Sequence, residues 1–450
     1  MTHGFVPTDA VLSTEGTERR RIPRQPRTLE DTGLSQEFIT DLLLKMLYVQ
    51  GALTGQTLTE RVALPFPFVD DQLLSLQQRR MVEVRGTHGP SRTGYVFDLT
   101  QEGRDRAREA LSSNMYVGPA PVPLAQYRHW VEAQSINQAQ VTRQVVYEGF
   151  DWLVLEQDTL DQVGPAINSA KSLFLHGEAG NGKTAIAETI ARMLGGTLYL
   201  PYAIEVDGQI VVVYDPLYHR KPLDEPPEHE AADHIWLPES QDHDRRYVRV
   251  ARPVVLTGGE LTLDQLDLQY DTHTKMYQAP FQVKANGGVL IVDDFGRQRV
   301  PPRDLLNRWI VPLEKRVDFL TLHTGNKFPI PFDCLLIFAT NLDPKQLVEE
   351  AFLRRIHYKI RVESPKREMY ERIFWRCCEA KGIPYDSGAV EQVYTEFYGP
   401  FRIAPRGCHP RDLVDHLLDI ARYLEVPPTL SQDLVHRSCR SYFLDFPTAG

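Results

Sequence analysis

Two short segments of this 450-residue chain carry residue types suited to phosphate and metal chemistry. The first, GEAGNGKT, covers residues 177–184 and matches the pattern G-x-x-x-x-G-K-[ST] in full. Its glycines let backbone N–H groups approach a phosphate closely, and Lys183 and Thr184 add an ammonium and a hydroxyl group. The second segment, VLIVDD, ends an apolar run with Asp293 and Asp294. Carboxylate oxygens are ligands that Mg²⁺ accepts, so we expect both segments to form one site.

The elements around the glycine loop support this expectation. SLFLH before the loop predicts a buried strand and AIAETIARML after it predicts an amphipathic helix, so a chance glycine-rich turn is disfavoured. This context predicts an ATP site in which Lys183 contacts the β- and γ-phosphates, while Thr184 and Asp293 hold Mg²⁺. The residues expected to bind the nucleotide here are Gly177, Glu178, Ala179, Gly180, Asn181, Gly182, Lys183, Thr184 and Ala185.

The segment VLIVDD resembles a Walker B motif, which usually has a glutamate where this chain has Asp294, and the resemblance implies that this residue polarises the attacking water. An aspartate is one methylene shorter, which withdraws the carboxylate by roughly 1.5 Å. A displacement of about 1 Å can slow a reaction about 10²-fold. We expect hydrolysis to survive, at a reduced rate, because the lysine, threonine, asparagine and arginines that hydrolysis also uses are all present.

Three later segments resemble, in order, three motifs of the AAA+ ATPases. FDCLLIFATNLDP (332–344) is an apolar run that ends at Asn341 and resembles sensor 1. AFLRRIHYKIRVESP (351–365) carries Arg354 and Arg355 and resembles the arginine-finger segment. HPRDLVDHLLDIARYL (409–424) opens a helix with Arg411 and resembles sensor 2, a role for which Arg406 is the competitor. The resemblance covers residues 150–445.

This resemblance implies an α/β fold, a P-loop αβα sandwich (the AAA+ core) with a C-terminal helical lid. It implies that subunits assemble as a ring, usually a hexamer, and that the cofactors are ATP and Mg²⁺. In that arrangement Asn341 lies between the acid pair and the γ-phosphate, and Arg411 contacts the nucleotide from the lid. Arg354 and Arg355 point into the neighbouring subunit's site; a solvated helix end is the alternative for them. The catalytic set is therefore Asp294, Asn341, Arg354 and Arg355.

Two features place the chain within that superfamily. The lead ANGG before VLIVDD and a predicted hairpin in HTGNKFPIPFD, just before sensor 1, resemble the branch of MoxR-like ATPases, magnesium-chelatase subunits and enhancer-binding activators. The G-A-F-T-G-A loop of the activators is absent, which argues against transcriptional activation. There is also a looser likeness to bacterial chaperone-like ATPases associated with pilus assembly.

The N-terminal part has the pattern of a winged-helix domain. Residues 38–80 predict three helices, MVEVR and GYVFDL predict two strands, and Thr100 is expected to cap a closing helix. Residues 35–111 hold nine Lys/Arg and ten Asp/Glu, and Asp70 and Asp71 begin the third helix. A DNA reader needs phosphate and base contacts there, so nucleic-acid binding is disfavoured against a protein partner.

The domain boundaries that we predict are 1–30 for a disordered basic leader with Arg19, Arg20, Arg21, Arg24 and Arg27, and 31–115 for the winged-helix-like domain. A proline-rich linker follows at 116–135, the nucleotide-binding core at 136–362 and the helical lid at 363–450.

The core contains an acidic insert at about 203–280. It begins with a hairpin about Asp207-Gly208, and residues 215–244 hold nine Asp/Glu and two Lys/Arg, a net charge of −7. We interpret it as a solvated loop on the pore or rim of the ring that contacts a partner. A metal cluster of His219, His229, His234 and His243 is disfavoured because the spacings fit no standard site. Tyr202, Tyr214 and Tyr218 are expected to serve packing rather than to grip a polypeptide.

Composition excludes several classes of protein. Fifty Lys/Arg against sixty Asp/Glu give a net charge of −10, which does not attract nucleic acid or anionic lipid. No apolar run approaches the ~20 residues of a membrane span, and the N-terminus does not have the layout of a signal peptide. Five cysteines without a C-x-x-C pair suit thiols in a reducing compartment, so we expect a cytoplasmic protein.

The sequence therefore predicts a ring-forming AAA+ ATPase that couples ATP binding and hydrolysis to remodelling or assembly of an unidentified protein client. One alternative is a DNA-associated AAA+ regulator or initiator that uses the winged helix. The other is a slow, nucleotide-gated scaffold, for which Asp294 is the motivating residue.

Overall fold

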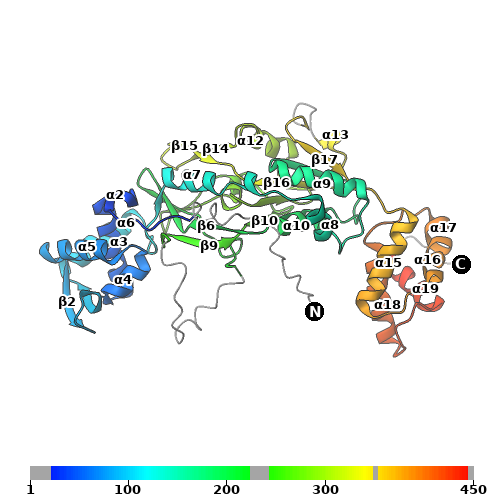
Figure 1. Cartoon of the computed structure of the whole chain (residues 1–450), viewed down its shortest axis with the longest axis horizontal. Coiled ribbons are helices and arrows are strands. Elements are labelled where there is room, and N and C mark those ends of the chain that lie inside the picture. Colours follow the sequence, from blue (N-terminus) through cyan, green and yellow to red (C-terminus); the bar gives the residue numbers. More distant parts are fainter. Residues whose placement is uncertain (1–21, 223–242, 348–352, 444–450) are drawn as a thin grey trace.

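Five strands form a parallel sheet at the centre of the molecule. This computed structural model describes residues 22–222, 243–347 and 353–443, and the sheet lies between the N-terminal and the C-terminal helices (Figure 1). Its strands lie in the order β10-β13-β16-β5-β17. The inner strands β13, β16 and β5 are almost entirely buried because both faces of such a sheet are covered, whereas the edge strands β10 and β17 also carry exposed residues. The strands are β5 (Ser172–His176), β10 (Val254–Thr257), β13 (Val289–Val292), β16 (Leu335–Thr340) and β17 (Tyr358–Arg361).

Helices cover the two faces of this sheet. Alternate residues of a strand point to opposite faces, so Leu173 and Leu175 pack into one cluster and Phe174 into another. The first cluster involves α8 (Arg143–Gly149), α9 (Gln157–Ser169) and α10 (Lys183–Met193); the second involves α11 (Phe281–Lys284) and α12 (Pro302–Lys315), with Trp309 fully buried. The predicted fold class is confirmed: the core is a P-loop αβα sandwich.

The first part of the predicted insert is a folded extension of the core. The expected hairpin forms between β7 (Ala203–Val206) and β8 (Gln209–Val212), and Asp207 and Gly208 both have positive φ, as a tight two-residue turn requires. This hairpin joins a second sheet with β4 (Val122–Pro123), β11 (Gln269–Asp271) and β12 (Met276–Gln278). A separate pair consists of β6 (Thr197–Pro201) and β9 (Tyr247–Ala251). The acidic stretch 223–242, with His229 and His234, lies outside the described residues.

A second predicted hairpin precedes sensor 1. Strands β14 (Val317–Thr321) and β15 (Lys327–Pro331) pair in antiparallel fashion, and Gly325 takes a positive φ in the turn. Helix α7 (Leu124–Ala133) lies on this hairpin, where Arg128 Nε donates to Pro329 O at 3.1 Å. The segment predicted as a proline-rich linker, 116–135, thus holds a strand and a helix. Pro123 occupies the N-cap position of this helix, where proline is tolerated, so the prolines of this segment do not mark a connector.

The N-terminal region has the predicted order of helices and strands. Its elements are α2 (Leu29–Thr32), α3 (Gln36–Gln50), β1 (Leu53–Thr54), α4 (Gly55–Val62), α5 (Phe66–Gln78), β2 (Val82–Thr87), η2 (Arg92–Gly94), β3 (Tyr95–Leu99) and α6 (Gln101–Ser113). Thr100 caps α6 by accepting from Gly103 N, as predicted. Residues 1–21 of the predicted leader lie outside the described residues. The backbone of Arg24 pairs with that of His243 in an isolated antiparallel β-bridge.

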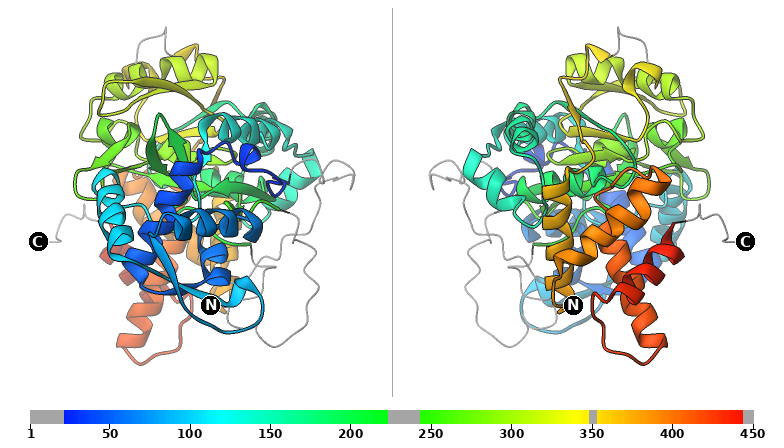
Figure 2. Two further views of the ribbon diagram at one scale, coloured as in Figure 1. Left: turned by 90° about the vertical axis from the view of Figure 1, so that its left-hand side faces the viewer. Right: turned by 90° about the vertical axis from the view of Figure 1, so that its right-hand side faces the viewer.

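The C-terminal helices pack around a separate aromatic cluster, as the predicted lid requires. They are α15 (Arg367–Lys381), α16 (Ser387–Gln392), the π-helix η5 (Val393–Tyr398), α17 (Gly399–Phe401), α18 (His409–Tyr423) and α19 (Gln432–Tyr442). Figure 2 views the molecule from its two ends, with the N-terminal helices at one and the C-terminal helices at the other. Short elements of the core are η3 (Ile136–Gln138), η4 (Leu263–Leu266) and α13 (Pro344–Leu347).

The described residues were also searched for membrane-spanning helices and for clusters of metal-ligating side chains. No helix of the described residues is long and apolar enough to cross a membrane. No group of three metal-ligating side chains occurs in the part of the chain that the structure describes, where His219 is instead buried and hydrogen-bonded to Asp215 N and Lys284 O.

Candidate nucleotide site

The carboxyl ends of three neighbouring strands bring the predicted site residues together. In the parallel register Thr340 of β16 lies beside His176 of β5, and Phe338 lies beside Val292 of β13. The glycine loop, Asn341 and Asp293 each follow one of these strands directly. Ligands of open α/β sheets bind at this edge, so the strand order alone explains why residues more than 100 positions apart meet.

The glycine loop has the backbone that a phosphate cradle needs. Gly177, Gly180 and Gly182 have φ values of 139°, 81° and 85°, in a region that side chains rarely adopt. A Cβ atom on Gly177 would lie 2.2 Å from Val362 O, and one on Gly180 would lie 2.5 Å from Cys408 Sγ. Nothing lies within 4 Å of the Cβ position of Gly182. The loop can therefore be built only from glycine at these places, and it leads into the N-terminus of α10.

Carbonyl oxygens of the glycine loop hold the side chain of Lys183 in place. Its Nζ donates to Gly177 O and Glu178 O, both at 2.9 Å, and the residue is 6 % exposed. Burial lowers the pKa of the ammonium group, and the carboxylates of Asp293, Asp294 and Glu178 oppose this effect. Two carbonyl oxygens thus hold the ammonium group at the loop.

The two predicted magnesium ligands are in direct contact. Thr184 Oγ1 donates to Asp293 Oδ2 at 2.7 Å. A hydroxyl and a carboxylate at this distance form an all-oxygen donor pair, which suits Mg²⁺. Asp293 N donates to Thr257 O at 2.8 Å, which anchors the acid to the next strand of the sheet.

Asp294 and Asn341 also meet, as the sequence suggested. Asn341 Nδ2 donates to Asp294 Oδ1 at 3.1 Å. Asp294 has a φ of 47°, an uncommon conformation that aspartate tolerates better than most residues. Gln298 Nε2 donates to Asp293 O at 3.0 Å and to Asp294 O at 3.3 Å, so this buried amide supports the turn that carries both acids. Nothing in the sequence pattern marked Gln298.

The segment between α17 and α18 contacts the loop through Arg406, whereas Arg411 of α18 does not contact it. Arg406 Nη1 lies 2.9 Å from Glu178 Oε2, and Cys408 N donates to Gly180 O at 2.8 Å. Arg411 instead pairs with Asp412, at 2.9 Å from Nη2 to Oδ1, and its side chain is 66 % exposed. Of the two arginines considered for sensor 2, the structure therefore places Arg406 at the glycine loop and Arg411 beside Asp412.

Asn181 joins the loop to both flanking segments. Its Nδ2 donates to Ser364 Oγ at 3.1 Å and its Oδ1 accepts from Gly407 N at 3.2 Å. The side chain is 7 % exposed, so these bonds are shielded from water. The loop, the segment after β17 and the start of α18 are thus linked by one amide. Ser364 stands before a proline in the sequence, and only the fold reveals its role.

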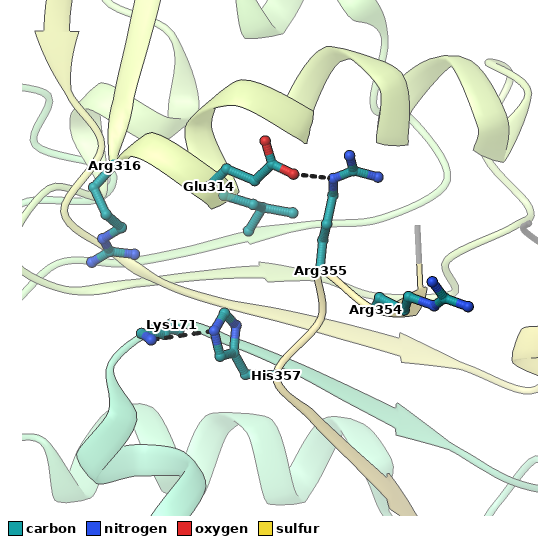
Figure 3. Close-up of a pocket in the computed structure, with 7 residues that line it drawn as sticks. Lys171, Glu314, Arg316, Arg354, Arg355 and His357 are labelled. Atoms are coloured by element: carbon teal, nitrogen blue, oxygen red, sulfur yellow. Dashed lines mark hydrogen bonds and ion pairs between the residues drawn. The ribbon is translucent and has the colours of Figure 1, made fainter. Parts of the chain in front are cut away.

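Arg354 and Arg355 lie far from this loop. They line a pocket at the amino end of β5 together with Lys171, Glu314, Arg316 and His357 (Figure 3). Gly177 lies six positions after Lys171, which is ~20 Å at about 3.3 Å per strand residue and beyond the reach of one side chain. Neither arginine can touch phosphates bound at the loop of its own chain.

The comparisons with known proteins cover the chain unevenly. A family described as Domain of unknown function (DUF8689) matches residues 366–441. A search of curated proteins finds no match. Among solved structures, the RuvB Holliday junction branch migration motor of Thermotoga maritima is similar, with 13 % identity, a TM-score of 0.35, and coverage of 70 % of this chain and 74 % of that chain. NtrX from Brucella abortus is similar with 14 % identity, a TM-score of 0.38, and coverage of 73 % and 66 %.

Proposed function

We propose that this chain is a Mg²⁺-dependent AAA+ ATPase whose sites are completed by a second subunit. The observation that carries the proposal is the contact between Thr184 and Asp293 at the mouth of the glycine loop, at 2.7 Å. Bound there, ATP supplies the phosphoryl group and Mg²⁺ neutralises its charge. The residues fit this cofactor pair, because the loop offers glycine backbone and a buried ammonium group, and the metal position offers two oxygen ligands.

Each site residue then has a role. The loop from Gly177 to Ala185 holds the phosphates, and Thr184 and Asp293 hold the metal. Asp294 accepts the proton of the attacking water, and Asn341 fixes the orientation of that carboxylate. Arg406 binds the nucleotide from the C-terminal helices, in the role that the sequence gave to Arg411. Arg354 and Arg355 act on the neighbouring subunit's nucleotide, because their own is out of reach.

The proposal extends to the assembly and its task. A ring, hexameric in the family that the motifs resemble, would bring the arginines of one copy to the loop of the next. The branch resemblance to MoxR-like ATPases fits the hairpin β14–β15, and the N-terminal region resembles a winged helix that selects a protein client. Arg92 pairs with Asp70 at 2.7 Å, so one arginine of the wing is neutralised within the domain, which disfavours DNA as the partner.

The test is phosphate release from ATP, measured per subunit over a wide range of protein concentration. Specific activity is expected to rise with concentration, and Lys183→Ala and Arg354→Ala/Arg355→Ala are expected to abolish it. Activity that is independent of concentration in the wild type and insensitive to the arginines would contradict a shared site. Steep salt-dependent binding of duplex DNA would favour the DNA-associated alternative.

The slow scaffold is the second candidate, and the constrained Asp294 favours it. Asp294→Asn keeps the size and tolerates the positive φ, but it cannot accept a proton. If Asp294 is the base, phosphate release should fall by about 10²–10⁴-fold while nucleotide binding is kept. A wild type that binds ATP, assembles and hydrolyses no faster than Asp294→Asn would identify a scaffold instead.

A further inference from the structure

A short turn after strand β13 carries both acids of the candidate site, and a buried glutamine, Gln298, follows it. Gln298 is 9 % exposed and lies outside the helices and strands. An uncharged polar side chain is normally exposed unless hydrogen bonds satisfy it inside the protein. The partners of this amide therefore indicate why it is buried here.

Both ends of the Gln298 amide bind the backbone of the turn. Its Oε1 accepts from Gly296 N at 2.8 Å, and its Nε2 donates to Asp293 O at 3.0 Å and to Asp294 O at 3.3 Å. These two carbonyl groups belong to the two peptide groups that flank the Cα atom of Asp294. Nε2 also lies 3.4 Å from the carbonyl oxygen of Gly258, which directly follows the neighbouring strand β10. One side chain thus holds both peptide groups beside Asp294 against the sheet.

The conformation held in this way is one that the backbone does not favour. Asp294 has a φ of 47°, in the left-handed region, where a residue with a Cβ atom is strained. Such strain persists only where the surrounding contacts fix the backbone. Because the side chain of an aspartate is short, a change in its backbone angles would move the carboxylate away from its partners.

Strand β16 holds the next part of the turn. Phe295 N donates to Ala339 O at 2.8 Å, and Thr340 Oγ1 donates to Phe295 O at 2.6 Å. These bonds fix Phe295 and do not involve the peptide group on the other side of Asp294. Strand β16 therefore positions the turn beside the sheet, whereas Gln298 bonds to the peptide groups that set the φ and ψ angles of Asp294.

We propose that Gln298 is a positioning residue for ATP hydrolysis, which keeps Asp294 in the left-handed conformation that brings its carboxylate to Asn341. In this conformation Asn341 Nδ2 donates to Asp294 Oδ1 at 3.1 Å. The inference rests on the proposed function, in which Asp294 accepts the proton of the attacking water. An aspartate depends on its backbone more than a glutamate does, because it has one torsion angle fewer with which to recover its place.

A merely structural role is the alternative, and Gln134 is the matched control for it. Gln134 is also 9 % exposed, and it also uses both ends of its amide: Oε1 accepts from Tyr199 N at 2.6 Å and Nε2 donates to Tyr199 O at 3.0 Å. It is the C-cap residue of α7 and bonds to β6, away from the acid turn. Methionine has nearly the shape of glutamine but lacks its hydrogen bonds, so one substitution removes the same group at either position.

The first test compares Gln298→Met with Gln134→Met in steady-state ATP hydrolysis, at a protein concentration where specific activity no longer rises. Both should lose thermal stability, because each leaves buried backbone groups unpaired. Gln298→Met should lower kcat about 10- to 100-fold and leave KM and binding of a fluorescent ATP analogue within about 2-fold of wild type. Gln134→Met should keep kcat within about 2-fold. Equal kcat values for the two variants, beside an active wild type, overturn the proposal.

A second comparison shows whether the effect passes through Asp294. In an Asp294→Asn background the base is already gone, so adding Gln298→Met should lower phosphate release by less than about 2-fold. A further loss as large as in the wild-type background would mean that Gln298 acts through the metal ligand Asp293 instead, and it would contradict the proposed role.

Hydrogen exchange tests the support of the turn without using activity. The segment 289–300 should exchange faster in Gln298→Met than in the wild type, and Gln134→Met should leave its exchange unchanged. If Gln298→Met does not fold, Gln298→Glu takes its place in each comparison, because it keeps the acceptor for Gly296 N and loses the donor. Unchanged exchange in a folded Gln298 variant would refute the support.

Failure of the proposed function gives a different pattern. If the wild type releases no phosphate at any protein concentration, there is no attack to position, and the ATPase and the role of Gln298 are rejected together. If the wild type hydrolyses ATP and Asp294→Asn slows it while Gln298→Met does not, the proposed function stands and only the inference about Gln298 is rejected.

Discussion

At the scale of single residues, the candidate nucleotide site contains a carboxylate, that of Glu178, to which the proposed ATP hydrolysis gives no role. Glu178 belongs to the glycine loop, next to the position where phosphates are expected, and it lies 2.9 Å from Arg406 Nη1. That nitrogen is buried, yet the ion pair does not have the geometry of a hydrogen bond. Arg406 is thus near an anion without being well satisfied by it, and a phosphate oxygen is a better acceptor.

Glu178 should therefore compete with the nucleotide for Arg406. Glu178→Gln is expected to tighten binding of an ATP analogue by about 2- to 5-fold, a modest gain because the pair is partly exposed. Equilibrium titration with a fluorescent analogue measures it. The gain should vanish in an Arg406→Ala background. If it persists there, simple repulsion by Glu178 explains it and the competition is refuted. Glu188→Gln, on the exposed face of α10, is the matched control.

At the scale of elements, the start of α18 belongs to the aromatic cluster of the C-terminal helices. His409 is the first residue of this helix, and its Nδ1 shares a hydrogen bond with Tyr398 OH at 2.8 Å, which in turn donates to Tyr370 OH. Burial, aided by Arg406, lowers the pKa of His409 to about 4, against the weaker opposing effect of Asp412. The histidine is thus a neutral part of the aromatic cluster.

Acid should loosen this cluster. Since the folded pKa lies below the unfolded value of 6.5, the unfolded chain binds the proton first, so stability is intact above pH 6.5 and is lost as the pH falls toward about 4. The loss approaches roughly 3 kcal/mol. Thermal unfolding between pH 7 and 4, followed by tyrosine fluorescence, measures it. His409→Gln should remove part of this pH dependence, and His416→Gln, on the same helix, should not. Equal pH profiles for the two variants would contradict the assignment.

At the scale of the whole molecule, one buried ion pair ties the N-terminal region to the core. Arg246 and Asp244 are 1 % and 3 % exposed and 2.7 Å apart. Arg246 also donates to Thr32 O at 2.8 Å, at the end of α2, and to Gln126 Oε1 at 3.2 Å, in α7. A guanidinium group with several donors can join three segments in this way, and a lysine could not replace it.

Breaking this pair should be costly. Arg246→Met leaves Asp244 buried without its partner, for which about 3–5 kcal/mol of destabilisation is expected. Arg246→Met/Asp244→Leu should recover much of that loss, because both charges are gone. Urea unfolding of the three proteins gives the comparison. A double variant no more stable than Arg246→Met would show that the hydrogen bonds to Thr32 and Gln126, and not the orphaned carboxylate, carry the stability.

The sequence by itself determined the glycine loop, the buried strands and the helices beside them, because each depends on local spacing and periodicity. It also located Asp293, Asp294 and Asn341 correctly at strand ends, since strands of one parallel sheet share an edge. It predicted both hairpins from their turn residues. It misjudged residues 116–135, which were predicted to be a linker from their prolines, although Pro123 occupies the N-cap position of helix α7.

Only the tertiary structure decided which residues meet across these elements. Arg406 and Arg411 are five positions apart and have the same chemistry, and the path of the chain between η5 and α18 places one at the loop and the other beside Asp412. Lys171, Glu314 and Arg355 come from three elements, and no spacing rule joins them. Contacts between distant segments depend on how helices pack on the sheet, which a local pattern does not encode.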